Sequence, residues 1–269
     1  MNANQNSRTS GGSFVTYVFI LAGLVGLFYL YQYLFGEQSR NMVTLLGSTQ
    51  KSDIDPGQAI TIPSSSLSSL YEGGEFTVSM WVYIQNWNYR LGRNKHILSI
   101  GGQNFDTIQV YLAASKNQLK VRFHTREGGN ATSSDNHTDL RATNKKSTFT
   151  ELHTDSGLLD SVPICDIPDI DLQRWVNIAI AVNGKTVDVY LDGKLARSCV
   201  LPAFYKVDGS GYSANLLQYG GFGGQISNVT MYNYAVNPEV AHKNYMAGPQ
   251  PITGFLDYLK SFFDPKSML

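Results

Sequence analysis

The sequence predicts an all-β protein, a sandwich of two antiparallel sheets, preceded by one membrane-spanning helix. Residues 175–201 contain two hairpin signals, each between runs rich in β-branched residues. Residues 14–35 form a stretch of 22 residues without a charged side chain. Glycine is abundant and only 16% of the residues are charged, which suits a protein with many strands and turns. With 21 basic and 21 acidic side chains, the chain has no net charge to attract nucleic acid.

Residues 14–35 are expected to form a single transmembrane helix after a polar N-terminal tail, residues 1–13. At ~1.5 Å per residue this stretch reaches roughly 33 Å, enough to cross a bilayer. A cleaved signal peptide and a buried core helix are the alternatives, but no small-residue cleavage site follows. The protein is therefore expected in a membrane with the lipid bilayer as a partner. The distribution of Arg8, Arg40 and Lys51 leaves the side of the globular part open.

Residues 36–56 are polar with little periodicity and predict a linker. Residues 57–248 are expected to form the sandwich, interrupted by a polar insertion at residues 126–157 that is too polar to bury. Apolar residues at helical spacing predict a C-terminal amphipathic helix over residues 249–269, docked either on the domain or on the membrane. Strands are predicted at residues 59–63, 76–84, 96–100, 107–112, 118–124, 215–219 and 225–234.

The most specific prediction is a three-stranded meander over residues 175–201. Two-residue turns at Asn183-Gly184 and Asp192-Gly193 would connect its strands. The first turn pairs Val182 with Lys185, Ile180 with Val187, Ile178 with Val189 and Val176 with Leu191. The second pairs Leu195 with Tyr190 and Arg197 with Asp188. A slip by one residue would expose every apolar side chain of the first set, so the alternation selects the face that is buried.

Three motifs carry a resemblance to a known superfamily. They are the W-x-N at Trp175, V-D-x-Y-x-D-G-K at residues 187–194 and G-x-I-S-N-V-x-x-Y-N-Y-A at residues 224–235. In these the chain resembles the concanavalin A-like lectin/glucanase superfamily with its laminin-G-type jelly roll. More narrowly, it is similar to membrane-anchored members from nucleocytoplasmic large DNA viruses. The resemblance implies a jelly-roll sandwich and a protein of a virion or host membrane that recognises a glycan or a protein. A structural role in contact with a capsid protein is the alternative.

The superfamily includes glycoside hydrolases, whose E-x-D-x-x-E pattern is absent from this sequence. Asp169 and Asp171 have the alternation that paired carboxylates need, but they precede Trp175 in a loop marked by Pro168. No catalytic residue is therefore assigned, and hydrolysis is the less favoured alternative. The histidines show no metal-ligand spacing on one element, so neither a metal site nor a cofactor is assigned. The resemblance leaves open a calcium site with unknown ligands.

A candidate ligand site lies in the loop after residues 76–84, at Trp87, Tyr89 and Arg90. An aromatic ring with adjacent polar groups at a loop end suits a glycan. The favoured alternative is that Trp87 simply packs over the edge of the sandwich.

Cys165 and Cys199 are the only cysteines. In the register above, the chain between them is long enough for a disulfide, which would stabilise the fold by ~4 kcal/mol. Two free buried thiols are the alternative. Asn130 and Asn136 match the N-glycosylation pattern, which applies if this domain enters a secretory lumen. Asn228 also matches but falls within a predicted strand.

Overall fold

The computed structural model describes residues 11–125, 142–153 and 165–250. The chain divides into two compact units, residues 1–41 and residues 42–269, which are described separately. The predictions for the N-terminal tail and for the C-terminal helix over residues 249–269 lie almost wholly outside the described residues.

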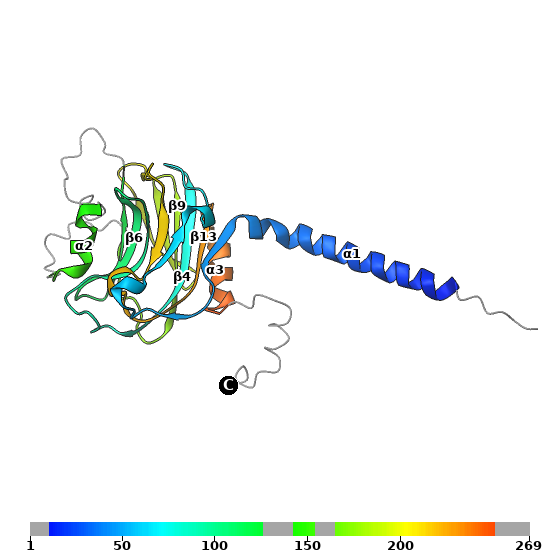
Figure 1. The fold of residues 1–269 in the computed structure, drawn as a ribbon, viewed down its shortest axis with the longest axis horizontal. Coiled ribbons are helices and arrows are strands. Elements are labelled where there is room, and N and C mark those ends of the chain that lie inside the picture. The colour runs from blue at the N-terminus through cyan, green and yellow to red at the C-terminus, as the bar shows by residue number, and fades with distance from the viewer. Residues whose placement is uncertain (1–10, 126–141, 154–164, 251–269) are drawn as a thin grey trace, which may run out of the picture. The chain divides into compact units, whose positions relative to one another are not determined.

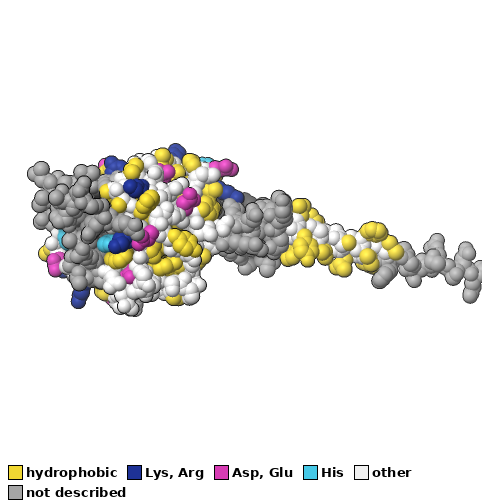
Figure 2. All heavy atoms as spheres, turned by 90° about the horizontal axis from the view of Figure 1, so that it is seen from above, with side chains coloured by type: hydrophobic (Ala, Val, Ile, Leu, Met, Phe, Trp, Pro, Cys, Tyr) yellow, Lys and Arg dark blue, Asp and Glu magenta, His cyan; other side chains and the backbone are white. Residues whose placement is uncertain are grey.

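The first unit is a helix, α1 (Gly11–Arg40), which covers the helix predicted for residues 14–35 and extends beyond it. The side chains of residues 15–30 are all exposed, including Phe19 and Tyr29. Hydrophobic side chains line the face of this stretch that Figure 2 shows. Over the residues that the structure describes, no helix is both long and apolar enough to cross a membrane.

The second unit is the predicted sandwich of two antiparallel sheets (Figure 1). The seven-stranded sheet contains, in spatial order, β1 (Met42–Leu46), β13 (Gly223–Tyr232), β4 (Glu75–Asn86), β9 (Trp175–Asn183), β10 (Thr186–Leu191) and β11 (Lys194–Val200), with β2 (Gln50–Lys51) also paired to β13. The six-stranded sheet contains β3 (Ile60–Pro63), β12 (Ser213–Leu216), β5 (Lys95–Gly101), β6 (Asp106–Leu112), β7 (Gln118–Phe123) and β8 (Ile167–Pro168). Short 3₁₀ turns are η1 (Pro56–Gln58), η2 (Ser64–Ser66) and η3 (Gln218–Gly220).

The core lies between the inner faces of the two sheets, as the alternation in β4 predicts. Every second residue of β4 is buried in this core: Phe76, Val78, Met80, Val82 and Ile84. Leu98 and Ile100 of β5 meet this layer from the six-stranded sheet. At about 25 cal/mol per Å² of apolar surface, such burial is the main stabilising contribution to the sandwich.

The meander is present, but its first turn lies one residue later than predicted. Asn183 pairs with Thr186, and the two loop residues are Gly184 and Lys185. Gly184 has a positive φ of +62°, whereas the φ of Lys185 is negative. This combination suits a type II′ turn with glycine in the first position. The shift moves each partner by two residues, so the buried face is unchanged. The observed apolar pairs are Val182 with Val187, Ile180 with Val189 and Ile178 with Leu191.

The second turn, at Asp192-Gly193, is where the sequence predicts it. Both residues have positive φ, +49° and +71°, as a type I′ turn requires. Leu195 lies opposite Tyr190 as predicted. A register shift follows, so that Arg197 lies opposite Val189 and the predicted pairing of Arg197 with Asp188 is wrong.

The linker prediction for residues 36–56 is wrong over most of its length, because α1 runs to Arg40 and because β1 and β2 both pair with β13. Leu45 and Leu46 are buried in the core. The sequence of β1, Met-Val-Thr-Leu-Leu, is apolar, and the prediction overlooked it among the polar residues that follow it. Both strands depend on β13, a partner far along the chain. Strand formation here follows from an available sheet edge more than from local sequence pattern.

A helix that the sequence analysis missed, α3 (Pro238–Ala247), covers the outer face of the seven-stranded sheet (Figure 1). Asn237 caps it by accepting a hydrogen bond from the backbone N–H of Val240, and Pro238 occupies the first turn. The ring of Tyr245 stacks on Trp81 of β4 at 5.8 Å between centroids. This contact explains why a tryptophan on the outer face of β4 is buried.

The polar insertion at residues 126–157 contains a second helix, α2 (Ala142–Thr150). Thr148 and Phe149 are buried, so the prediction that this segment is too polar to bury is wrong for them. Phe149 is the one aromatic residue of this helix, so the sequence shows no hydrophobic periodicity that would predict a buried helix face. Its burial follows from contacts with the outer face of the six-stranded sheet, toward which α2 lies in Figure 1.

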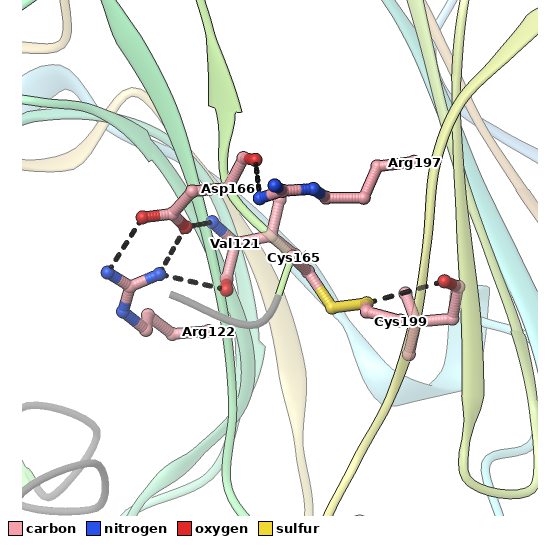
Figure 3. Close-up of a disulfide and its surroundings, with 7 residues drawn as sticks. Val121, Arg122, Cys165, Asp166, Arg197 and Cys199 are labelled. Carbon is pink, nitrogen blue, oxygen red and sulfur yellow. Dashed lines mark hydrogen bonds and ion pairs between the residues drawn. A yellow bond between two sulfur atoms is a disulfide. The ribbon is translucent and has the colours of Figure 1, made fainter. Parts of the chain in front are cut away.

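The predicted disulfide between Cys165 and Cys199 is present, with 5.7 Å between the Cα atoms (Figure 3). It joins edge strand β11 of one sheet to the segment before β8 at the edge of the other. Beside it, Arg197 donates to the backbone oxygen of Asp166 at 2.6 Å, and Arg122 pairs with the Asp166 carboxylate. The two sheets are thus connected along one open side of the sandwich by the disulfide and by the Arg197 hydrogen bond, while the Arg122 ion pair holds Asp166 within its own sheet.

Candidate binding cleft

Trp87 packs over the edge of the sandwich, which was the favoured alternative. Its indole N–H donates to the backbone oxygen of Ser115 at 3.1 Å. The ammonium of Lys95 lies 4.6 Å from its ring centroid. Trp87 does not line the cleft to which Tyr89 and Arg90, the other two residues of the predicted site, contribute.

Tyr89 and Arg90 do lie together at a cleft. The Tyr89 hydroxyl donates to the backbone oxygen of Gly220 at 2.9 Å. The Arg90 guanidinium donates to the backbone oxygen of Phe149 at 2.6 Å. These two bonds tie the loop between β4 and β5 to η3 and to α2, which are distant in sequence.

The cleft has a volume of about 420 Å³, within the range of small-molecule sites. Four segments contribute to its lining: the chain before and at η1, the β4–β5 loop, α2, and η3. The lining residues are Asp53, Ile54, Asp55, Pro56, Tyr89, Arg90, Arg93, Lys146, Thr150, Tyr219 and Gly220. Of the three predicted ligand residues, the structure therefore brings Tyr89 and Arg90 to the cleft.

Glycine at position 220 allows the close approach of Arg90. Gly220 has φ +91°, and a Cβ built there would lie 2.6 Å from a terminal nitrogen of Arg90. Its left-handed backbone also favours glycine sterically. Gly220, to which the sequence analysis gave no role, therefore shapes one wall of the cleft.

The cleft is rich in charge and is partly desolvated. Three cationic side chains, Arg90, Arg93 and Lys146, face two carboxylates, Asp53 and Asp55. Burial lowers the pKa of the Arg90 guanidinium, and the nearby Tyr89 offsets this in part. The guanidinium remains charged at neutral pH, since an arginine pKa starts above 12.

The two tyrosines of the cleft are neutral donors at physiological pH. Burial raises the pKa of Tyr89, and the carboxylates of Asp53 and Asp55 raise it further against the opposing effect of Arg90. Burial also raises the pKa of Tyr219, with a smaller contribution from Asp106. Both hydroxyls consequently keep their proton; Tyr89 donates its proton to the Gly220 backbone oxygen and offers a ligand its lone pairs and its ring.

The carboxylates that were considered for catalysis lie outside the cleft lining. Asp169 and Asp171 are exposed in the loop after β8, and Asp171 pairs with Arg174. The described part of the chain holds no group of three or more His, Cys, Asp or Glu residues suited to a metal ion. The glycosylation candidates Asn130 and Asn136 lie outside the described residues, and Asn228 lies half-buried in β13.

The sequence analysis missed most of the cleft. Asp53 and Asp55 fall in the predicted linker, Lys146 and Thr150 in the predicted loop, and Tyr219 at a predicted strand end. No motif joins these positions, because only the tertiary structure brings them together. Of the lining residues that were missed, Arg93 lies in the same loop as Arg90, three residues later. Extending the predicted site along that loop would have included it.

No protein-family model matches the chain, and no curated protein matches it. Among solved structures, it is similar to the botulinum neurotoxin serotype D ligand-binding domain in complex with N-acetylneuraminic acid. The identity is 14%, the TM-score 0.45, and the match covers 77% of this chain and 42% of that one. The receptor-binding domain of botulinum neurotoxin D is also similar (13% identity, TM-score 0.48, 77% and 48% covered).

A Trypanosoma rangeli sialidase is similar at 11% identity and a TM-score of 0.36, with 65% of this chain and 23% of that one covered. The chain thus spans less than half the length of each of these structures. At these identities and TM-scores, no ligand or activity is transferred to this chain. The assignment of the cleft depends on its own geometry.

Proposed function

We propose that this protein is a membrane-anchored, non-catalytic recognition module that binds a glycan in the cleft of Tyr89, Arg90 and Tyr219. One observation carries the proposal: two tyrosines, three cationic groups and two carboxylates line one cleft of about 420 Å³. Arginine and tyrosine donate to sugar oxygens, carboxylates accept from sugar hydroxyls, and aromatic faces contact the ring C–H groups. This mixture suits a polyhydroxylated ligand better than a purely apolar one.

The excess of cationic over acidic groups favours a sugar that carries a carboxylate. A planar guanidinium binds a carboxylate through two parallel hydrogen bonds. Arg93 and Lys146 are both exposed, so their donors are accessible to such a ligand. Asp53 and Asp55 would repel a second anionic group, which limits the ligand to sugars whose acidic group lies on one side.

A glycan array tests the proposal with the full chain reconstituted in lipid nanodiscs. We expect saturable binding to acidic sugars, and a loss of at least about tenfold in Arg93→Ala and Lys146→Ala, equivalent to ~1.4 kcal/mol for each. Lys194→Ala is the matched control, because Lys194 is exposed on β11 and does not line the cleft. Absence of binding to any sugar, or equal losses in all three variants, would refute the glycan assignment.

The membrane anchor is proposed from the sequence of residues 14–35, which has 22 residues and no charge. Its exposed apolar side chains over residues 15–30 need an apolar environment. Resistance of the full chain to extraction by alkaline carbonate would support the anchor, and release into the soluble fraction would contradict it. Protease protection in sealed vesicles would then determine the side on which the sandwich lies.

Placement in a virion, contact with a capsid protein and glycoside hydrolysis stay predictions from the superfamily resemblance. No feature of the described residues favours them over glycan recognition.

A further inference from the structure

Exposed apolar side chains gather at one end of the sandwich. Tyr71, Val200 and Phe204 have exposed fractions of 70%, 65% and 46%. Tyr71 lies in the loop before β4, Val200 is the last residue of β11, and Phe204 follows it in the next loop. Large apolar side chains that are exposed together mark a surface that contacts a partner or a membrane. We call these three residues the apolar end of the domain.

Local contacts hold the loops of the apolar end together. The backbone N–H of Gly74 donates to the backbone oxygen of Tyr71 at 2.9 Å, which closes a tight turn. The Phe204 ring lies against this turn, since a Cβ built on Gly73 would lie 2.9 Å from a ring carbon. The ammonium of Lys185, in the β9–β10 turn, lies 5.2 Å from the centroid of the Phe204 ring. The three loops therefore form one continuous surface.

The chain enters the sandwich at this same end. Met42, the first residue of β1, pairs with Tyr232 of β13, which pairs with Thr77 of β4. Thr77 pairs in turn with Ala181, close to the end of β9 at the β9–β10 turn. Val200 pairs with the first residue of β10, directly after that turn. Met42 and the apolar end therefore lie at the same end of the seven-stranded sheet.

Little chain separates Met42 from the proposed anchor. Only residues 36–41 lie between the predicted span, residues 14–35, and the start of β1. Fully extended, a stretch of this length reaches roughly 20 Å. The headgroup layer on each side of a bilayer is on the order of 5–7 Å thick. An anchored chain therefore keeps this end of the sandwich close to the headgroups, whichever side of the membrane the domain occupies.

The residue types of the apolar end suit the boundary between lipid and water. A tyrosine such as Tyr71 has an apolar ring and a polar hydroxyl, a combination that is enriched at membrane interfaces. A lysine such as Lys185 can lay its apolar stem along lipid while its ammonium stays in water. The exposed carboxylates of Glu72 and Glu75 offset that ammonium, so this end has no net attraction for anionic lipid. Apolar contact is consequently the main source of binding.

We propose that the apolar end lies against the surface of the bilayer, with its three apolar side chains in the headgroup layer. The proposal rests on the anchor proposed above and adds the orientation of the domain. β4 begins at Glu75 near this end and runs for 12 residues to Asn86, after which the loop contributes Tyr89 and Arg90 to the cleft. At ~3.3 Å per residue, β4 spans roughly 40 Å. The contact therefore holds the cleft away from the membrane and open to ligands in solution.

Spin labels on the full chain in phosphatidylcholine vesicles test this contact. The two native cysteines form the disulfide, so only an introduced thiol reacts with the label. The labelled variants are Tyr71→Cys and Val200→Cys. Leu172→Cys is the matched control, because Leu172 is an exposed apolar residue that precedes β9 at the opposite end of the sheet. With a water-soluble nickel complex on both sides of the bilayer, we expect its access to the first two labels to be at least about threefold lower than to the control.

A charge placed on the apolar end provides a second test. Val200→Asp puts a carboxylate among the side chains that contact lipid, and should raise nickel access to the Tyr71→Cys label to the level of the control. Leu195→Asp is its matched variant, because Leu195 is 54% exposed at the other end of the same strand, β11. It should leave nickel access unchanged. The same effect in both variants, or in neither, overturns the proposal.

Flotation of the vesicles in a density gradient separates this inference from the anchor. If the chain does not float with the vesicles, the anchor is refuted and the orientation with it. If the chain floats but the nickel complex reaches all three labels equally, the anchor stands and the contact of the apolar end is refuted.

Discussion

Lys145 and Lys146 are consecutive residues of α2, yet their ammonium groups serve two different surfaces. The ammonium of the half-buried Lys145 pairs with the buried carboxylate of Asp106 on the outer face of the six-stranded sheet. Lys146 is exposed and lines the cleft with Tyr89 and Arg90. Consecutive helical residues point about 100° apart, so one short helix contributes to both sites.

This pair gives a matched test of how α2 is held. Lys145→Ala removes the ammonium from the buried Asp106 carboxylate and should weaken docking of α2 by about 2 kcal/mol. Lys146→Ala should change it by less than about 0.5 kcal/mol, because its side chain is exposed. Hydrogen exchange of the α2 amides measures the difference. Equal exchange in both variants would mean that the ion pair does not hold the helix.

Removal of the disulfide should destabilise the sandwich. The double variant C165S/C199S frees a loop with a sequence separation of 34 residues, which corresponds to about 4 kcal/mol in the chain-entropy model. Urea unfolding of variant and wild type checks this value, with reduced wild type as the control. A loss below ~1 kcal/mol would indicate that the hydrogen bond from Arg197 to the backbone oxygen of Asp166 suffices to hold the two sheet edges.

Gly220→Ala should damage the cleft and leave the sandwich folded. The added Cβ would meet Arg90, and the left-handed backbone would be strained, together costing about 1–3 kcal/mol. Gly209→Ala is the control, because no atom lies within 4 Å of its added Cβ. Glycan binding and thermal unfolding of both variants provide the readout. If Gly220→Ala binds glycan as well as wild type does, the position of Arg90 does not matter for glycan recognition.

Acid should destabilise the domain through His96. Burial holds the pKa of His96 well below its ordinary value of 6.5, and the charge of Lys145 lowers it further. The unfolded chain therefore takes up a proton below pH 6.5 while the folded chain does not. Stability is complete above pH 6.5 and falls as the pH decreases toward the lowered pKa. Thermal melts between pH 7.5 and 5 should show this decrease, and His96→Gln should reduce it, whereas His242→Gln on the exposed side of α3 should not.

The carboxylate of Asp208 should contribute a separate pH effect in a lower range. Burial alone would raise the pKa of Asp208, but hydrogen bonds from Ser210 and Asn104 outweigh it and lower the pKa to about 2. This contribution to stability is present above the ordinary pKa of 3.8 and is lost as the pH falls toward 2. Asp208→Asn should remove that part of the acid transition without altering the decrease between pH 6.5 and 5. An unchanged transition below pH 4 would contradict the assignment.

Local chemistry explains which elements the sequence predicted well. The Asp192-Gly193 turn and the alternation in β4 depend on residues within a few positions of each other. Even the displaced first turn preserved the buried face, since Val182 and Ile180 remain on the same side after a shift of two residues. The disulfide followed from the same reasoning, because chain length sets how far Cys165 can reach.

The sequence by itself determined the two-sheet architecture and the meander, and it showed that a link between Cys165 and Cys199 was sterically open. The structure decided that the link forms. Only the tertiary structure decided that Met42–Leu46 is a strand, that α2 is a helix with Phe149 buried, and that Asp53, Arg90, Lys146 and Tyr219 share one cleft. The physical reason is the distance along the chain over which each element finds its partners. Turn geometry and side-chain alternation are local, whereas an edge strand, a docked polar helix and a cleft exist only when distant segments supply the other half of every contact.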